Sequence, residues 1–300
     1  MSRSFVQSLL ARSYSPAIAT QILHGFKGVR PSSFRRNTLK ISEKDLAAAI
    51  ALLGFEVTPV PSIVGAYQFA REHEYAFKGS RLFREGLVYL QSLSSMIPAK
   101  VLAPSAQARV LDVCAAPGSK TTQMAAMMAN TGEIIALEKS PVRADILRHN
   151  IVLQGVTNTV IVRQEGLSYM AGLVPGTFSA ILLDAPCSGM GRLSVDRDEP
   201  WKYIDPANLL RRSDLQKKLL ARSLELLAPG GVLVYSTCTL GHEENRDVIS
   251  AVARTHRGFS LEVPDLTVLG AQCVPDEHGV AILPDANYEG FYISKLIKNS

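Results

Sequence analysis

The sequence predicts an α/β protein with a mostly parallel sheet, preceded by a smaller α+β module. From Val101 onward, short apolar segments alternate with helical ones, which is typical of a parallel sheet covered by helices on both faces. The 300 residues are 47% hydrophobic and 20% charged, which provides enough apolar material for a core and argues against a disordered chain. No apolar run reaches the ~20 residues of a membrane-spanning helix.

The amino-terminal third, residues 1–100, is expected to hold a helix followed by a small α+β module. Apolar residues at helical spacing predict a helix over residues 16–26. Segments 34–39 and 55–60 are predicted strands on either side of a helix over 43–53. Ser42 is a favourable N-cap for that helix, and Gly54 ends it.

The charge of this third suggests a polyanion partner. Residues 1–100 carry 13 Lys and Arg against 6 Asp and Glu, a net +7, whereas residues 101–300 carry 19 against 21, a net −2. Four basic residues surround the first predicted strand: Arg30, Arg35, Arg36 and Lys40. Tyr67 and Phe69 offer aromatic faces on which single-stranded RNA bases stack. Ordinary solubilising charge and aromatic side chains that fill a small core explain the same pattern.

The remaining two thirds, residues 101–300, are predicted to form the large sheet. Its expected strands are 110–113, 132–137, 159–163, 180–184 and 231–236. Helices are expected at 120–128, 143–154 and 215–227. Because parallel sheets bind ligands beyond the carboxyl ends of their strands, the loops that follow these strands are the places to look for a site.

The loop after the first strand indicates a cofactor site. It begins at Asp112 and is built from small residues: Cys114, Ala115, Ala116, Pro117, Gly118 and Ser119, followed by Lys120. Small side chains let the backbone approach a ligand closely. Glu138 ends the next strand, where a carboxylate accepts hydrogen bonds from ribose hydroxyls. Together they suggest an adenosine-containing cofactor; separately, each is explained by a tight turn and a solvated glutamate.

Two cysteines follow two further strands. The strand ending at Asp184 runs into Cys187, and the strand ending at Ser236 runs into Cys238. A lone cysteine is more often a small buried hydrophobic residue than a nucleophile. Two cysteines on one rim, with an aspartate three residues before one of them, favour a catalytic site. None of the four cysteines forms a Cys-x-x-Cys pair, so no metal is expected.

With these motifs the chain resembles the NOL/NOP/Sun (Fmu- and RsmB-like) family of RNA cytosine-C5 methyltransferases. The motifs are DVCAAPGSK (112–120), Glu138 with Arg143, DAPCSGMG (184–191) and STCTL (236–240), supported by RRNTLK (35–40), YLQSLSSMIPA (89–99) and GFYISKLIK (290–298). The resemblance implies a Rossmann-like class I methyltransferase fold with a mostly parallel seven-stranded sheet in residues 101–300. It also implies S-adenosylmethionine as cofactor, and tRNA or rRNA as substrate.

The same resemblance assigns a cofactor site. Its residues are Cys114, Ala115, Ala116, Pro117, Gly118, Ser119, Lys120, Glu138, Arg143, Glu165 and Asp184. Two positions depart from the family pattern. Ser119 stands where the family usually has glycine, and Glu165 stands where it usually has an aspartate that contacts adenine. The chain also has no room for the additional RNA-binding domain that many members carry.

The catalytic roles follow from the chemistry of cytosine. C5 is a poor nucleophile, but addition of a thiolate at C6 turns the ring into an enamine-like species that can take a methyl group. By resemblance, Cys238 attacks C6, Cys187 assists proton removal or product release, and Asp184 hydrogen-bonds the N3/N4 edge of the base. Lys120 either favours the thiolate or contacts RNA, unless it is a helix-start lysine that faces backbone or solvent.

Several residues near the Cys187 loop remain open. Arg192, Arg197 and Lys202 follow the loop and are candidates for phosphate contacts, and Trp201 is either a core anchor or a stacking surface. Cys273 lies outside every motif and is expected to be structural. A monomer in the cytoplasm is expected, without a membrane partner. The Ser-rich opening with Arg3 and Arg12 leaves a mitochondrial precursor as the lesser alternative.

Two other functions remain open. A DNA cytosine-C5 methyltransferase would use Cys187 as its nucleophile, and the Cys238 loop argues against that. A non-catalytic RNA-binding or ribosome-assembly factor would keep the fold without the chemistry. The intact set of Asp184, Cys187 and Cys238 argues against it.

Overall fold

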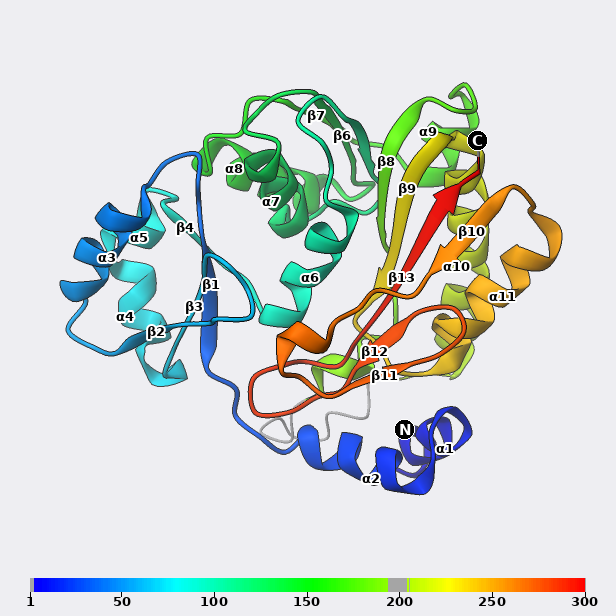
Figure 1. Ribbon diagram of the computed structural model, residues 1–300, viewed down its shortest axis with the longest axis horizontal. Helices are drawn as coiled ribbons and strands as arrows, with labels where there is room; N and C mark the ends of the chain where they lie inside the picture. The colour runs from blue at the N-terminus through cyan, green and yellow to red at the C-terminus, as the bar shows by residue number, and fades with distance from the viewer. Residues whose placement is uncertain (1–2, 194–203, 205, 300) are drawn as a thin grey trace.

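The computed structural model describes residues 3–193, 204 and 206–299 (Figure 1). At its centre lie five mutually parallel strands in the order β7-β6-β5-β8-β9. Their bounds are β5 Arg109–Asp112, β6 Glu133–Leu137, β7 Thr159–Val162, β8 Phe178–Asp184 and β9 Leu227–Thr237. This order places the carboxyl ends of β5, β6, β8 and β9 side by side at one edge of the sheet.

Four antiparallel strands extend the sheet beyond β9. They are β10 Phe259–Glu262, β11 Cys273–Pro275, β12 Val280–Ile282 and β13 Phe291–Lys298. One edge of β13 pairs with β9, and its other edge is shared, with residues 291–293 facing β12 and 295–298 facing β10. The predicted seven-stranded row, β7-β6-β5-β8-β9-β13-β10, is therefore present, and the β11–β12 hairpin adds two strands at the β13 edge.

Helices cover both faces of this sheet (Figure 1). On one face lie α1 Arg3–Ser13, α2 Pro16–Gly25, α9 Gly166–Ala171, α10 Pro206–Leu226 and α11 Arg246–Thr255. The other face is covered by α6 Leu93–Leu102, α7 Ser119–Met127 and α8 Pro141–Leu153. Alternate residues of each strand enter the two cores, as Leu111 and Val110 do in β5. This double burial explains the continuous apolar runs in the sequence.

The amino-terminal module is a four-stranded antiparallel sheet in the order β2-β3-β1-β4, with short helices beside it. Its elements are β1 Ser32–Arg36, α3 Glu43–Ala51, β2 Val57–Pro59, β3 Ala66–Phe69, η1 Arg71–His73, α4 Glu74–Gly79, α5 Arg81–Arg84 and β4 Val88–Leu90. Ser42 caps α3 as predicted, by accepting a hydrogen bond from the amide of Asp45 at 3.1 Å. Phe34 lies at the centre of the module core, with its ring 4.9 Å from that of Phe77 and 5.2 Å from that of Tyr67.

The packing divides the chain differently from the expected boundary at residue 100. Helices α1 and α2 bury Leu9, Leu10 and Ile22 in the same core as β8 and β9, and α6 packs on the opposite face of the sheet. Only residues 32–90 form the separate small core. Amphipathic spacing predicts that a helix buries one face, but it does not say which element covers that face.

The basic residues near β1 have structural roles that the sequence did not suggest. The buried Arg35 guanidinium donates to Gln91 Oε1 at 2.9 Å and to Thr122 Oγ1 at 2.6 Å, and thereby ties the module to α7. Lys40 Nζ donates to backbone carbonyl oxygens at the ends of α5 and α8. Phe69 belongs to the module core. Arg35 and Phe69 are buried and therefore do not face RNA, and for Phe69 the core-filling alternative holds, whereas Lys40 remains exposed with its ammonium on those two carbonyls.

Candidate active site

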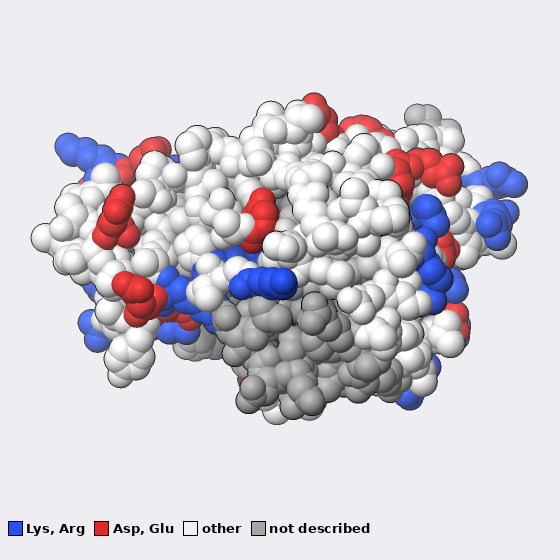
Figure 2. All heavy atoms as spheres, turned by 90° about the horizontal axis from the view of Figure 1, so that it is seen from below, with Lys and Arg blue, Asp and Glu red and all other residues white. Residues whose placement is uncertain are grey.

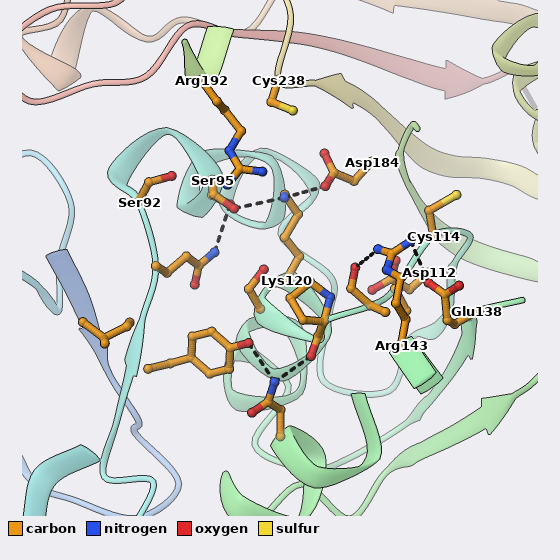
Figure 3. Close-up of a pocket in the computed structure, with 18 of the residues that line it drawn as sticks. Ser92, Ser95, Asp112, Cys114, Lys120, Glu138, Arg143, Asp184, Arg192 and Cys238 are labelled. Atoms are coloured by element: carbon orange, nitrogen blue, oxygen red, sulfur yellow. Dashed lines mark hydrogen bonds and ion pairs between the residues drawn. The ribbon is translucent and has the colours of Figure 1, made fainter. Parts of the chain in front are cut away.

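A cavity of about 950 Å³ opens between the module and the carboxyl ends of the central strands. It is lined on one side by residues that precede and follow β4, and on the other by the loops after β5, β6, β8 and β9. Figure 3 shows that Lys120, Asp184, Cys238, Glu138 and Arg143 all face this space. The predicted catalytic and cofactor loops therefore meet in one cavity.

The two cysteines are in contact. Asp184 of β8 lies directly opposite Ser236 of β9, so the loops that follow these strands leave the sheet together. Cys187 Sγ lies 3.3 Å from Cys238 Sγ. The loops are further joined by a hydrogen bond of 2.9 Å between the hydroxyls of Ser188 and Thr239. Two motifs that are 51 residues apart thus act as one structural unit.

Lys120 bridges the loop after β5 and Asp184 (Figure 3). Its Nζ donates to Asp184 Oδ2 at 2.6 Å and to Ser95 Oγ at 3.0 Å. The other carboxylate oxygen of Asp184 accepts a hydrogen bond from Ser236 Oγ at 2.7 Å. Lys120 is only 7% exposed, and its ammonium lies 5.4 Å from the centre of the Phe291 ring. The alternative that Lys120 faces backbone or solvent is therefore wrong.

The charges around the two sulfurs are asymmetric. The hydrogen bond from Cys187 lowers the pKa of Cys238, and the positive charges of Arg192 and Lys120 act in the same direction, against burial and Asp184. The same hydrogen bond raises the pKa of Cys187, as do burial and the carboxylates of Glu244 and Asp184. Cys238 is consequently the better thiolate of the pair.

Glu244, a residue that the sequence analysis missed, binds the backbone of the Cys187 loop. Its fully buried carboxylate accepts hydrogen bonds from the amide of Ser188 at 2.9 Å and from Gln216 Nε2 at 3.1 Å. Burial raises its pKa. Glu244 lies six residues after Cys238 in a polar stretch, so no hydrophobic pattern marked it as buried.

The loop after β5 packs against α8. Gly118 has a φ of +105°, and a Cβ there would lie 2.9 Å from the Leu147 side chain, so glycine is required. Asn150 Nδ2 donates to the carbonyl of Pro117 at 2.8 Å, and Arg143 Nη2 donates to that of Ala116 at 2.6 Å. Both donors belong to α8, so these bonds fix the loop to that helix.

Acidic residues end the strands around this loop. Glu138, at the end of β6, accepts a hydrogen bond from the amide of Ser140 at 2.8 Å and pairs with Arg143 at 3.1 Å. Glu165 caps α9 by accepting from the amide of Ser168 at 2.9 Å, and it also lines the cavity. Asp112, which the sequence analysis left without a role, is buried at the base of the loop, where burial raises its pKa to about 7.

The remaining candidates are less central. Arg192 has a largely exposed side chain that points into the cavity, 4.0 Å from the carboxylate of Glu289 (Figure 3). Cys114 lines the cavity, and burial raises the pKa of its thiol. Cys273 lies on β11, in the antiparallel extension. Arg197, Trp201 and Lys202 lie outside the residues that the structure describes.

Fold and loops together define a Rossmann-like methyltransferase. The model of the family "16S rRNA methyltransferase RsmB/F" matches residues 99–297. The chain therefore belongs to the RsmB/F methyltransferase family, as the motifs predicted. Within the described ranges, no helix is long and apolar enough to cross a membrane.

Curated relatives and solved structures agree with this assignment. The chain is 39% identical to ribosomal RNA small subunit methyltransferase F of Serratia proteamaculans over 273 residues, which cover 89% of the chain and 57% of the relative. It thus spans little more than half the length of that relative. A methyltransferase homologue from Pyrococcus horikoshii is 30% identical, with a TM-score of 0.77 and coverage of 99% of this chain and 100% of that one.

A further solved structure supports the fold alone. NSun6 from Pyrococcus horikoshii, solved with SFG, is 23% identical and superposes with a TM-score of 0.82, covering 98% of both chains. The amino-terminal module is therefore included in a known architecture, although the family model begins only at residue 99.

Proposed function

We propose that the protein is an S-adenosylmethionine-dependent RNA cytosine-C5 methyltransferase that works through a covalent bond between Cys238 and C6 of the target base. The observation that carries this proposal is the contact of 3.3 Å between the sulfurs of Cys187 and Cys238, beside the Asp184–Lys120 ion pair. The names of the curated relatives favour small-subunit ribosomal RNA as the substrate.

S-adenosylmethionine fits the carboxyl-end edge of the sheet, and it supplies an electrophilic methyl group when bound. Cys114, Ala115, Ala116, Pro117 and Ser119 of the loop after β5 line the cavity, while Gly118 packs against Leu147 of α8. Glu138 ends β6 with a carboxylate that lines the cavity, where it can accept hydrogen bonds from ribose hydroxyls. Arg143 orients that carboxylate, and Glu165 lies at the position expected to face the adenine.

The chain's own residues divide the work on cytosine. The Cys238 thiolate forms a bond to C6, and the electron pair moves toward C5. Asp184, fixed by Lys120 and Ser236, accepts a hydrogen bond from the exocyclic amine and holds the base edge. After methylation, a water molecule takes the C5 proton, the electrons of that bond re-form the C5–C6 double bond, and the sulfur–C6 bond breaks to return the thiolate. Cys187, whose contacts favour the thiol, lies beside the departing sulfur and assists this release by donating a hydrogen bond to it.

The two cysteines should therefore fail in different ways. Cys238→Ser should abolish methyl transfer and the covalent adduct, because the attacking sulfur is missing. Cys187→Ala should allow attack but slow release, and so accumulate a protein–RNA complex that survives denaturing electrophoresis. The double variant should show no complex. Cys273→Ser, remote from the cavity, is the matched control and should behave as wild type.

The same gel separates the alternatives. An adduct that persists in Cys238→Ser and disappears in Cys187→Ala would overturn the role assignment and support the DNA-type nucleophile. Labelled-methyl transfer to RNA but not to DNA is expected; transfer to neither would support a non-catalytic RNA-binding factor. Bisulfite mapping of small-subunit rRNA from cells that lack the protein would then identify the methylated cytosine. Cytoplasmic location and a monomeric state stay predictions.

A further inference from the structure

The module contributes a net positive wall to the cavity. The charged residues that segment 30–92 places along the cavity are three cations, Arg30, Arg71 and Lys78, and one carboxylate, Glu74. Seen from below, Lys and Arg side chains gather where the module meets the rest of the molecule (Figure 2). This wall is separate from the cysteine loops, but it belongs to the same continuous cavity.

The charges on this wall are only partly compensated. Lys78 Nζ lies 2.6 Å from Glu74, which also accepts a hydrogen bond from Ser32 Oγ at 2.6 Å. Arg30 is engaged by backbone carbonyls, including those of Gly25 and Tyr288. Burial lowers the pKa of Arg30; the nearby carboxylates of Glu289 and Asp285 oppose that shift, and the positive charge of Arg71 adds to it. The cations that this wall turns toward the cavity can still attract a phosphate.

An exposed aromatic residue lies next to these cations. Tyr75 of α4 is 91% exposed, so its ring is accessible to a partner. It lies three residues before Lys78 in α4 and four after Arg71 of the preceding η1, so it neighbours both cations at the rim, on the solvent side of the cavity-lining residues Arg71, Glu74 and Lys78. An exposed aromatic ring between cations is the arrangement with which proteins hold single-stranded nucleic acid.

We infer that this face of η1 and α4, formed by Arg71, Tyr75 and Lys78, holds the RNA strand next to the target cytosine. Tyr75 stacks on an unpaired base, while Arg71 and Lys78 contact flanking phosphates. The inference rests on the proposed function, since a target base that enters the cavity must leave its stack and draw the neighbouring nucleotides to the cavity mouth. It replaces Arg35, which is buried against α7, as an RNA contact of the module.

RNA affinity measured without catalysis tests the inference. The protein carries Cys238→Ser, which prevents adduct formation, and the probe is a short fluorescein-labelled single-stranded oligoribonucleotide followed by anisotropy. Tyr75→Ala should weaken binding about 5- to 150-fold, the loss that corresponds to one stacked base. Tyr75→Phe should retain the affinity, because the ring remains. Leu52→Ala, at a site on the module that is 87% exposed and does not line the cavity, is the matched control.

Salt dependence tests the two cations. Arg71→Ala and Lys78→Ala should each reduce the slope of log affinity against log salt by about 0.7, the value for one phosphate contact on a single strand. Unchanged slopes, or a Tyr75→Ala affinity equal to that of Leu52→Ala, would overturn the inference. Adduct formation with a high concentration of RNA by the same variants in the Cys187→Ala background reports on the chemistry separately. If the Cys187→Ala variant with Tyr75 intact formed no adduct, that result would instead count against the proposed function.

Discussion

Replacement of Arg35 by methionine should destabilise the protein by about 2–4 kcal/mol. Methionine keeps an apolar stem of similar length but removes the guanidinium. Arg35 Nε and Nη2 donate to Gln91 Oε1 and to Thr122 Oγ1, and the guanidinium lies 5.1 Å from the centre of the Tyr89 ring. Loss of the cation–π contact costs about 1 kcal/mol, and each acceptor left buried without a donor costs about 1–3 kcal/mol. Relief of the desolvation of a buried cation offsets part of that sum.

The neighbouring arginine provides the control. Arg36 is only partly buried and lies 3.9 Å from the exposed carboxylate of Glu43, so Arg36→Met should cost less than about 1 kcal/mol. Urea unfolding, followed by circular dichroism, measures the free energy of unfolding of both variants. The two values are comparable when the free energy falls with urea concentration at the same slope. If Arg35→Met were as stable as Arg36→Met but bound RNA less tightly, Arg35 would be an RNA contact after all. Burial lowers the pKa of Arg35 to about 10, so the guanidinium remains charged at neutral pH.

Three further predictions concern buried or cavity-lining carboxylates. Glu138→Ala should weaken S-adenosylmethionine binding about 10- to 100-fold in calorimetry, because a charged acceptor for ribose is lost; an unchanged affinity in a folded variant contradicts the placement. Asp112 has a folded pKa of about 7, above its unfolded ~3.9, so the unfolded state loses its proton first and stability falls as pH rises between those values. Asp112→Asn should flatten that fall in urea midpoints taken at several pH values, and parallel profiles would refute it. Glu244→Gln should let Cys187 react with iodoacetamide at lower pH while Cys238 is unaffected, as mapped by mass spectrometry; identical profiles would show that Glu244 only holds the loop.

The meeting of the two cysteine loops was predictable in part, because it depends on backbone periodicity. Apolar runs predicted β8 and β9 as buried strands of one parallel sheet, and the ends of such strands face one edge, so Cys187 and Cys238 were expected on the same rim; that the two strands are neighbours comes from the structure. For the loop after β5, the small residues predicted a close approach to a ligand, whereas the close approach that the structure has at Gly118, with its positive φ, is to Leu147 of α8.

Other features could not be predicted, because they depend on where individual side chains point. Arg35 and Arg36 are adjacent in sequence, yet Arg35 is hydrogen-bonded to Thr122 of α7, whereas Arg36 faces Glu43. Glu244 is buried although it lies in a charged stretch, because Ser188 and Gln216 supply its hydrogen bonds from other elements. The helix α10 begins at Pro206, earlier than the expected residue 215, since its first turns carry few apolar residues at helical spacing.

Asp184 and Ser236 lie opposite each other near the ends of β8 and β9, and the number of residues after this pair sets the position of each sulfur. Cys187 is reached by counting three residues forward on one strand and Cys238 by counting two on the other. Each residue added to or removed from a strand shifts everything beyond it by about 3.3 Å and turns the following side chains to the opposite face. Substitutions within β8 and β9 leave the number of residues unchanged. A single-residue insertion or deletion in either strand would move one sulfur relative to the other by about 3.3 Å, which is about the distance that now separates them. The site thus tolerates changes of composition far better than changes of length.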